Sequence, residues 1–182
     1  MLTNEEITQR QKEAAAMIEN AGLLLTSEEK QSIEIADFGL SEFATTGLGV
    51  FVYVNTDRCC AKELAMWPRQ TCPEHIHPTL NGEPGKEETF RCRWGKVFLY
   101  VAGEATPNPQ SQPPSGREKT YTVWHQIALS PGQQYTIYPD TPHWFQAGDE
   151  GAIISEFSTR STDELDVFTD PEIGRFTEVA GE

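Results

Sequence analysis

The N-terminal segment has the polar and apolar spacing of helices. A weak apolar stripe recurs every three or four residues and falls on one helical face, at Ile7, Gln11, Ala14 and Ile18. Thr3 with Glu6, and Thr26 with Glu29, fit capping boxes at two helix starts. We therefore expect residues 1–40 to form a helical lead-in that packs on the main body.

From Gly47 onward the chain changes to short runs of β-branched and aromatic residues, separated by Gly, Pro, Asn and Asp. The runs are GVFVYVNT, KELAMWP, RWGKVFLYVAG, YTVWHQIALSPGQQYTIYP, HWFQAG and GAIISEFST. Many short strands with turn residues between them are typical of a β-sandwich or barrel. The pattern predicts a mainly β fold with its barrel over residues 47–160.

Two segments lack the strand pattern. Residues 103–120, GEATPNPQSQPPSGREKT, are rich in Pro, Ser and Gln and predict a long loop within the barrel. Residues 161–182 form an acidic, turn-rich C-terminal tail. No internal repeat is visible, so we expect a single domain over residues 1–182.

The composition is that of an acidic globular protein. The chain has 182 residues, 37% of them hydrophobic, which is enough for a sizeable core. Its formal net charge of -14 argues against binding to nucleic acid, which needs a basic face, and against anionic membranes. We therefore expect neither as a partner.

The N-terminus indicates the cytoplasm, and this compartment in turn sets the expected state of the cysteines. The start MLTNEEITQRQKEA has no apolar core behind a basic stretch, so it does not resemble a secretory signal. The four cysteines form no CxxC pair, which disfavours a thiolate zinc site, and we expect four reduced thiols.

Two of the four histidines stand one residue apart in PEHIHP. Side chains alternate along a strand, so His75 and His77 face the same side, where two neutral imidazoles suit a divalent metal. Glu87 or Glu88 can return to this side after the intervening turn and supply an oxygen ligand. An isolated HxH would more often be a pair of surface strand residues.

The third imidazole has to be His125 or His143. His143 follows a Pro-containing turn in YPDTPHWF, from which a distant strand could bring its nitrogen into the barrel mouth. His125, in TVWHQIALSPG, matches no motif and is expected to take no part. The combination of HxH, a later Glu, Gly95 and PDTPH favours a metal site.

These residues resemble the two motifs of the cupin superfamily. The first motif has HxH, Glu, six residues and Gly, and the second has Gly, a Pro turn and His; they match here at His75, His77, Glu88, Gly95, Gly132 and His143. The Gly usual in the second turn and the Asn usual after its His are replaced, the latter by Ala147. The wide gap from His77 to Glu88, HWFQAG, SEFST and DELDVFTDPEIGRF resemble the D-lyxose isomerase branch.

This resemblance covers most of the chain. It implies a cupin-type β-sandwich or jelly-roll barrel with an N-terminal helical arm, and Mn²⁺ held by four ligands: His75, His77, Glu88 and His143. The family interconverts D-lyxose and D-xylulose, and several members also act on D-mannose and D-fructose. The resemblance selects Glu88 over Glu87, and alternation then turns Glu87 toward solvent.

Aldose–ketose isomerisation suits such a site. It moves a proton between C1 and C2, and a divalent ion with two open positions could polarise the carbonyl and stabilise an enediolate. A proton carrier is also needed. Glu156 is a carboxylate on an otherwise apolar strand: a general base and a paired structural acid are equally open from the residues, and the resemblance favours the base.

Further side chains are candidates for contact with the sugar. Lys62 could hold a sugar oxygen or donate a proton, Asp166 could hold a distal hydroxyl, and Trp144 and Phe157 could offer ring faces to C–H groups. Each has an ordinary alternative: a solvated lysine, a solvated acidic face or core aromatics.

Two other functions stay open. The same ligand set binds iron in cupin dioxygenases, and a non-catalytic cupin could bind only a sugar or a metal. Glu156, Lys62 and Asp166 favour the isomerase, because a dioxygenase of apolar substrates can do without such groups. By analogy with other cupins we also expect a homodimer, formed through strand edges or the helical arm.

Overall fold

The two N-terminal helices start at the expected capping boxes. In the computed structural model, which describes residues 1–180, α1 spans Asn4–Asn20 and α2 spans Ser27–Gln31. Thr3 and Thr26 each cap a helix with the reciprocal hydrogen bonds of a capping box. Within the described residues, no helix has the length and apolar character needed to cross a membrane.

The helical lead-in is shorter than the sequence predicts. After α2 the chain turns and Glu34–Ala36 forms a strand, β1, which pairs with residues 48–50. Strand geometry is favoured here because it buries Ile35 and Ala36 in two different apolar clusters, on opposite faces of the sheet.

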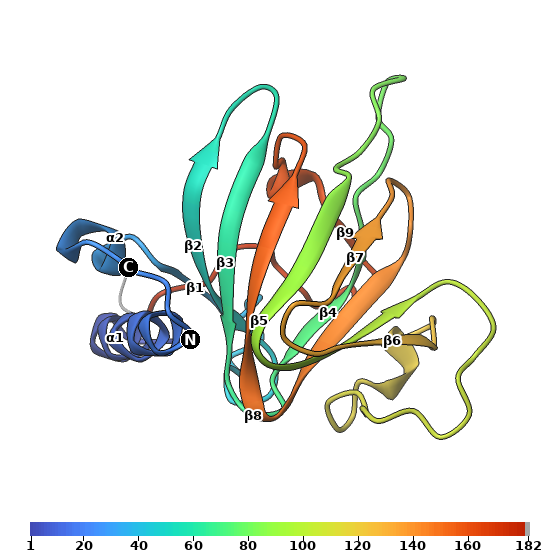
Figure 1. The fold of residues 1–182 in the computed structure, drawn as a ribbon. Coiled ribbons are helices and arrows are strands. Elements are labelled where there is room, and N and C mark those ends of the chain that lie inside the picture. Colours follow the sequence, from blue (N-terminus) through green and yellow to red (C-terminus); the bar gives the residue numbers. More distant parts are fainter. Residues whose placement is uncertain (181–182) are drawn as a thin grey trace.

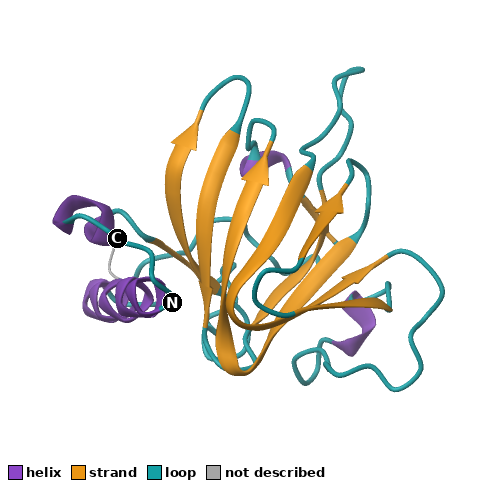
Figure 2. Cartoon of the chain, in the orientation of Figure 1, coloured by secondary structure: helices purple, strands orange, loops and turns teal. Residues whose placement is uncertain are grey.

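The rest of the chain confirms the predicted mainly β fold. The strands are β2 (Leu48–Asn55), β3 (Cys60–Met66), β4 (Thr71–Ile76), β5 (Glu88–Val101), β6 (His125–Leu129), β7 (Gln134–Ile137), β8 (His143–Ser158) and β9 (Val167–Phe168). With β1 they form one curled antiparallel sheet in the order β1-β2-β3-β8-β4-β9, to which β5, β6 and β7 are joined by pairing of β5 with β8 (Figures 1 and 2).

The long strands β5 and β8 give the sheet its curl. The first half of β8 pairs with β4 and the second half with β3, while β5 pairs along both halves. Gly95 sits at an irregularity of this pairing with φ 72°, and a Cβ there would lie 2.1 Å from the Gly151 carbonyl oxygen. Only glycine fits such a close approach, which explains the motif glycine seen in the sequence.

The two faces of the sheet carry separate apolar clusters. Leu64 and Ile154 belong to the inner cluster, whereas their neighbours Ala65 and Ile153 belong to the outer cluster beneath α1. Period-two alternation of strand side chains produces this division. The inner face surrounds the cavity described below.

The acidic tail is packed on the barrel. We call residues 161–180 the C-terminal strap; it contains the 3-10 turn η2 (Asp163–Leu165) and β9, which pairs with β4. Gly174 donates its backbone N–H to the carbonyl of Phe38 (3.0 Å), and the Thr177 hydroxyl donates to the carbonyl of Ile35 (2.8 Å). Residues 181–182 of the expected tail lie outside the described part of the chain.

The Pro-rich segment is a loop, as expected. Residues 103–120 contain no strand, and their only helical element is the short η1 (Glu118–Thr120) at the end. The cysteines in the described residues are all free thiols: Cys59 is exposed, and Cys60, Cys72 and Cys92 are buried.

Candidate metal centre and active site

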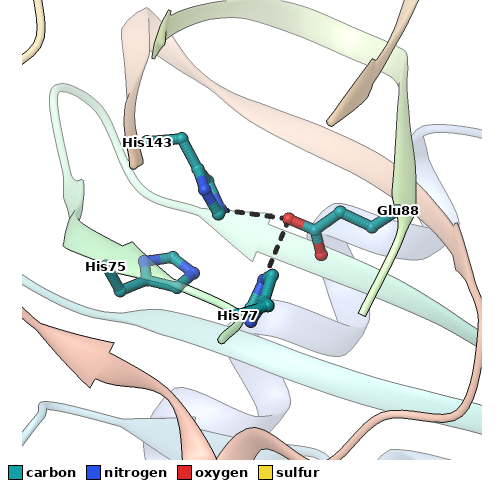
Figure 3. Close-up of side chains that lie close together, drawn as sticks. All are labelled: His75, His77, Glu88 and His143. Atoms are coloured by element: carbon teal, nitrogen blue, oxygen red, sulfur yellow. Dashed lines mark hydrogen bonds and ion pairs between the residues drawn. The ribbon is translucent and has the colours of Figure 1, made fainter. Parts of the chain in front are cut away.

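Three strands bring the four expected ligands together inside the barrel. His75 lies in β4, His77 one residue beyond it, and Glu88 and His143 at the first positions of β5 and β8. One ligand atom from each residue lies within 4.8 Å of all the others, and all four side chains are buried (Figure 3). Strand pairing places His75 directly opposite His143.

The imidazoles are oriented through their Nδ1 atoms. His75 and His143 donate from Nδ1 to the carbonyls of Pro73 (2.8 Å) and Thr141 (2.9 Å). Such bonds fix the tautomer and leave the Nε2 lone pair for a metal. The buried Nε2 of His143 has no hydrogen-bond partner of good geometry, although it lies 3.1 Å from a Glu88 oxygen.

The charges around the cluster suit a cation. Burial alone would lower the pKa of His77, but the Glu88 charge and hydrogen bonds to Asp166 and Glu88 raise it to about 9. The buried Glu88 has a pKa well below its usual range, because the charges of Lys86 and His77 outweigh the effect of burial. Burial, with the two neighbouring histidines, holds the pKa of His75 well below normal and keeps it neutral.

This donor set fits a divalent metal ion. Three imidazole nitrogens and one carboxylate oxygen, all buried and converging, are ligands that Mn²⁺, Fe²⁺ or Zn²⁺ accepts. Without a cation, the buried Nε2 of His143 would keep a lone pair with no well-oriented partner, which is costly inside a protein.

The cavity beside the cluster has an apolar side and a charged side. Its cavity volume is about 50 Å³, and it opens to solvent at its mouth. Phe38, Leu48, Phe90 and Phe145 are among its apolar walls, and its charged lining comprises Lys62, Lys86, Glu88, Glu156, Asp163, Asp166 and Arg175. A concave apolar site with a few converging polar groups suits a small molecule.

Glu156 lies at the centre of the charged side. Its Oε1 is 3.2 Å from Nζ of Lys86 and 3.4 Å from Nζ of Lys62. Lys86 also lies 2.8 Å from the candidate ligand Glu88, and Lys62 lies 2.8 Å from Asp163. These contacts connect Glu156 to the ligand cluster through a single side chain.

Both lysines remain ammonium groups at neutral pH. Burial acts to lower the pKa of Lys62 and of Lys86, but the neighbouring carboxylates, Glu156 first, raise both above the usual value. Lys62 and Lys86 are therefore hydrogen-bond donors in the cavity rather than groups that readily release a proton.

Not every residue singled out in the sequence lines the cavity. Trp144, expected to offer a ring face to a sugar, is fully buried elsewhere: it stacks on Tyr100 with centroids 4.0 Å apart and donates from Nε1 to Val123. Phe157 points outward and is 49% exposed. Both follow from strand alternation, since each adjoins a residue that faces the cavity.

Glu87 and His125, the two alternative ligands considered from the sequence, lie outside the cluster. Glu87 is exposed while Glu88 is buried, as alternation predicts. His125 binds the carbonyl of Glu104 through Nδ1 (3.0 Å) and is not part of the cluster.

Sequence reasoning missed three charged cavity residues. Lys86 stands two residues before Glu88, so alternation could have placed it on the ligand side. Asp163 and Arg175 lie in the strap, where no periodic pattern marks them; Arg175 joins Glu34 (2.6 Å) and Asp163 (3.2 Å). Asp166 lines the cavity, as expected for a sugar contact, but its carboxylate also accepts from Nδ1 of His77 (2.6 Å).

A curled β-sheet with three histidines and a glutamate beside an inner cavity defines a cupin-type fold with a candidate metal site. The fold is similar to L-ribose isomerase of Cellulomonas parahominis, with a TM-score of 0.83 over 98% of both chains and 16% identity. L-ribose isomerase of Acinetobacter sp. DL28 in complex with L-ribose gives the same TM-score, coverage and identity. At this identity the likeness shows the fold alone.

The sequence comparisons are more specific. The D-lyxose isomerase family model matches residues 4–182. The chain is 59% identical over 179 residues to a D-lyxose/D-mannose isomerase of Thermosediminibacter oceani, covering 98% of this chain and 99% of that one. It is 60% identical over 161 residues to a D-lyxose ketol-isomerase of Cohnella laeviribosi, covering 88% of each. The chain belongs to the D-lyxose isomerase family.

Membership of this family decides between the isomerase, dioxygenase and binding functions, which the ligand set alone leaves open. Relatives named as ketol-isomerases make the protein an aldose–ketose sugar isomerase. The iron dioxygenase and the non-catalytic binder have no such support.

Proposed function

We propose that the protein interconverts D-lyxose with D-xylulose and D-mannose with D-fructose, using Mn²⁺ and proton transfer through an enediol. The observation that carries the proposal is the buried set of three histidines and Glu88 placed one lysine away from Glu156. The relative from Thermosediminibacter oceani, named for both sugars, supports the two substrates.

The metal would be held by His75, His77, Glu88 and His143. When bound there, a divalent ion polarises the sugar carbonyl and orients two adjacent sugar oxygens. The mixed nitrogen and oxygen ligands are compatible with Mn²⁺, and metal supply contributes to which ion is used in the cell.

Glu156 is the proposed general base. Its carboxylate would take the proton from C2 of the aldose and return it to C1, while the hydroxyl proton moves from O2 to O1. Lys62 and Lys86 hold its Oε1 between two ammonium groups, which fixes the carboxylate toward the cavity. Such positioning is a large part of what a catalytic base requires.

The charged wall would bind the sugar hydroxyls. Lys62 donates hydrogen bonds to Ser161 and Asp163 and is ion-paired with Glu156 at 3.4 Å. It would hold a sugar oxygen, and its raised pKa favours holding over proton donation. Asp163 and Arg175 present an acceptor and a donor from the strap. Asp166 is the candidate for a distal hydroxyl through the oxygen that His77 does not use. The apolar wall would pack against sugar C–H groups.

A glutamate-to-glutamine pair tests the proposal. With Mn²⁺ added, Glu156→Gln should lower kcat for D-xylulose formation from D-lyxose by about 100- to 10,000-fold, the usual loss on removing a general base. Glu87→Gln, the exposed neighbour of the ligand, should keep kcat within a factor of about two. D-Mannose is assayed in parallel by D-fructose formation. Unchanged kcat in Glu156→Gln would remove Glu156 from the mechanism.

A homodimer in the cytoplasm completes the proposal. β1 pairs with β2 only at residues 48–50. Beyond these residues, the edge of β2 that faces away from β3 has no strand partner among residues 1–180. Val52, Tyr53 and Val54 on this edge are at least 40% exposed. An exposed apolar edge is a common site of self-association. Light scattering on the purified protein gives the mass directly.

A further inference from the structure

The strap contacts the ligand cluster without supplying a ligand. Oδ1 of Asp166 lies 2.6 Å from Nδ1 of His77, with the two side chains 9% and 3% exposed. In β9, Phe168 pairs with His75, and the two rings have centroids 5.5 Å apart. Residues 166–168 of the strap therefore contact two of the candidate ligands, His77 and His75.

His77 depends on the strap more than the other imidazoles do. His75 and His143 are each oriented by a carbonyl two residues earlier in their own strand or turn, Pro73 and Thr141. His77 follows the last residue of β4 and is oriented by a carboxylate 89 residues away in sequence. Its ring position is thus a tertiary property, set by where the strap lies.

The strap is also anchored by contacts that do not involve the four candidate metal ligands. Arg117, at the end of the Pro-rich loop, binds Asp170 (2.7 Å) and Glu172 (3.1 Å) of the strap and also Glu42. The hydroxyl of Thr169 donates to the buried Glu74 (2.7 Å). These anchors set the position of Asp166 without touching any of the four ligands.

We propose that Asp166 is a positioning residue that couples the C-terminal strap to the metal through His77. A carboxylate on Nδ1–H fixes the ring and makes Nε2, the nitrogen that would bind the metal, a better donor. Coupling of two binding events is reciprocal, so a docked strap strengthens metal binding and a bound metal strengthens docking of the strap. This inference rests on the proposed metal-dependent function.

Metal affinity is the direct test. Mn²⁺ binding to the full chain, measured by calorimetry after chelator treatment, should weaken by about 10- to 100-fold in Asp166→Ala, the range for lost supporting partners of a ligand. Asp166→Asn should weaken it less, because the amide oxygen can still accept from Nδ1–H. Glu164→Ala, an exposed acid in the same strap, is the matched control and should leave affinity unchanged.

A remote anchor separates coupling from local damage. Arg117→Ala removes the ion pairs to Asp170 and Glu172, and coupling predicts weaker Mn²⁺ binding although no ligand contact is lost. In the wild type, Mn²⁺ should slow tryptic cleavage after Arg160, and Asp166→Ala should reduce this protection at the same Mn²⁺ concentration. A purely structural Asp166 would change the melting temperature but neither Mn²⁺ affinity nor Mn²⁺-dependent protection.

The outcomes separate this inference from the proposed function. A wild-type protein that binds no Mn²⁺ overturns both. A wild-type protein that binds Mn²⁺ with the same affinity as folded Asp166→Asn and Asp166→Ala overturns the role of Asp166 alone. Unchanged Mn²⁺ affinity in folded Arg117→Ala overturns the coupling to the strap.

Discussion

The helical arm and the C-terminal strap both wrap the same barrel, but they are held by different forces. The arm buries Ala14 and Ile18 against strand residues such as Phe51 and Ile153 on the outer face of the sheet. The strap also packs Phe168 and Ile173 on the inner cluster, but it adds ion pairs and hydrogen bonds and places charged side chains on the cavity wall. We therefore expect the arm to contribute chiefly to stability and the strap chiefly to the charged wall of the cavity.

This difference also explains which part could be recognised in the sequence. Apolar packing is non-directional and leaves a periodic pattern, so the stripe ending at Ile18 predicted the arm. Charged contacts depend on single residues at irregular spacing, so no pattern in the acidic tail marks Asp163 and Arg175 as cavity residues.

The largest effect on stability is expected in the arm. Ile18→Ala should lower the free energy of unfolding by about 2–5 kcal/mol, since Ile18 is fully buried and the substitution leaves a cavity. Denaturant unfolding measures the loss, and kcat should stay within about twofold of wild type under folded conditions. Leu24→Ala, at a residue 89% exposed, is the control and should unfold like wild type. A large fall in kcat of folded Ile18→Ala would contradict the division of roles.

A substitution in the strap should lower activity more than stability. Asp163→Asn weakens contacts to Lys62 and Lys86 and to Arg175, so the groups around Glu156 shift. A misplacement of about 1 Å can cost about 100-fold, and we expect kcat/KM to fall by about 10- to 100-fold. Steady-state kinetics measure this fall. Glu164→Gln should be silent, and a wild-type kcat/KM in Asp163→Asn would place the strap outside catalysis.

The smallest effect concerns a buried charge on the outer face. Burial raises the pKa of Glu63, whose hydrogen bond from Ser155 (2.7 Å) only partly compensates, and its Oε2 has no partner. The folded state therefore binds a proton more tightly than the unfolded chain, whose glutamates titrate near pH 4.3. Glu63 costs stability as pH rises from there through its raised folded pKa.

Glu63→Gln removes this titration. Its stability relative to wild type should increase as the pH rises from 4 to 7, because only the wild type has a Glu63 that must lose its proton. Unfolding curves at the two pH values measure the change. Parallel pH profiles for the two proteins would show that Glu63 does not titrate abnormally.

The fold and the convergence of His75, His77, Glu88 and His143 were predicted well from the sequence. Strand runs, turn residues and both capping boxes appear where expected, because each depends on neighbours along the chain. The cluster was within reach since HxH and the turn before His143 are local patterns. The prediction of a helical lead-in over residues 1–40 was wrong at Glu34–Ala36. There, pairing with β2 makes the chain a strand, β1.

The cavity walls were predicted less well. Trp144 is next to the ligand His143 and therefore faces the other side of β8, a consequence of alternation that the sequence contained. The position of Lys86 on the cavity side could have been predicted by the same alternation. The Asp166 contact to His77 could not, because it joins residues far apart in the chain through the path of the strap.

A metal titration tests the central claim most directly. Chelator-treated protein is assayed for D-xylulose formation from D-lyxose as Mn²⁺ is added, with His77→Ala and the matched His125→Ala in parallel. We predict that Mn²⁺ restores activity with saturation near one ion per chain in the wild type and in His125→Ala, and does not restore it in His77→Ala. Full turnover by the metal-free wild type, or wild-type activity in His77→Ala, would contradict a metal-dependent isomerase at this site.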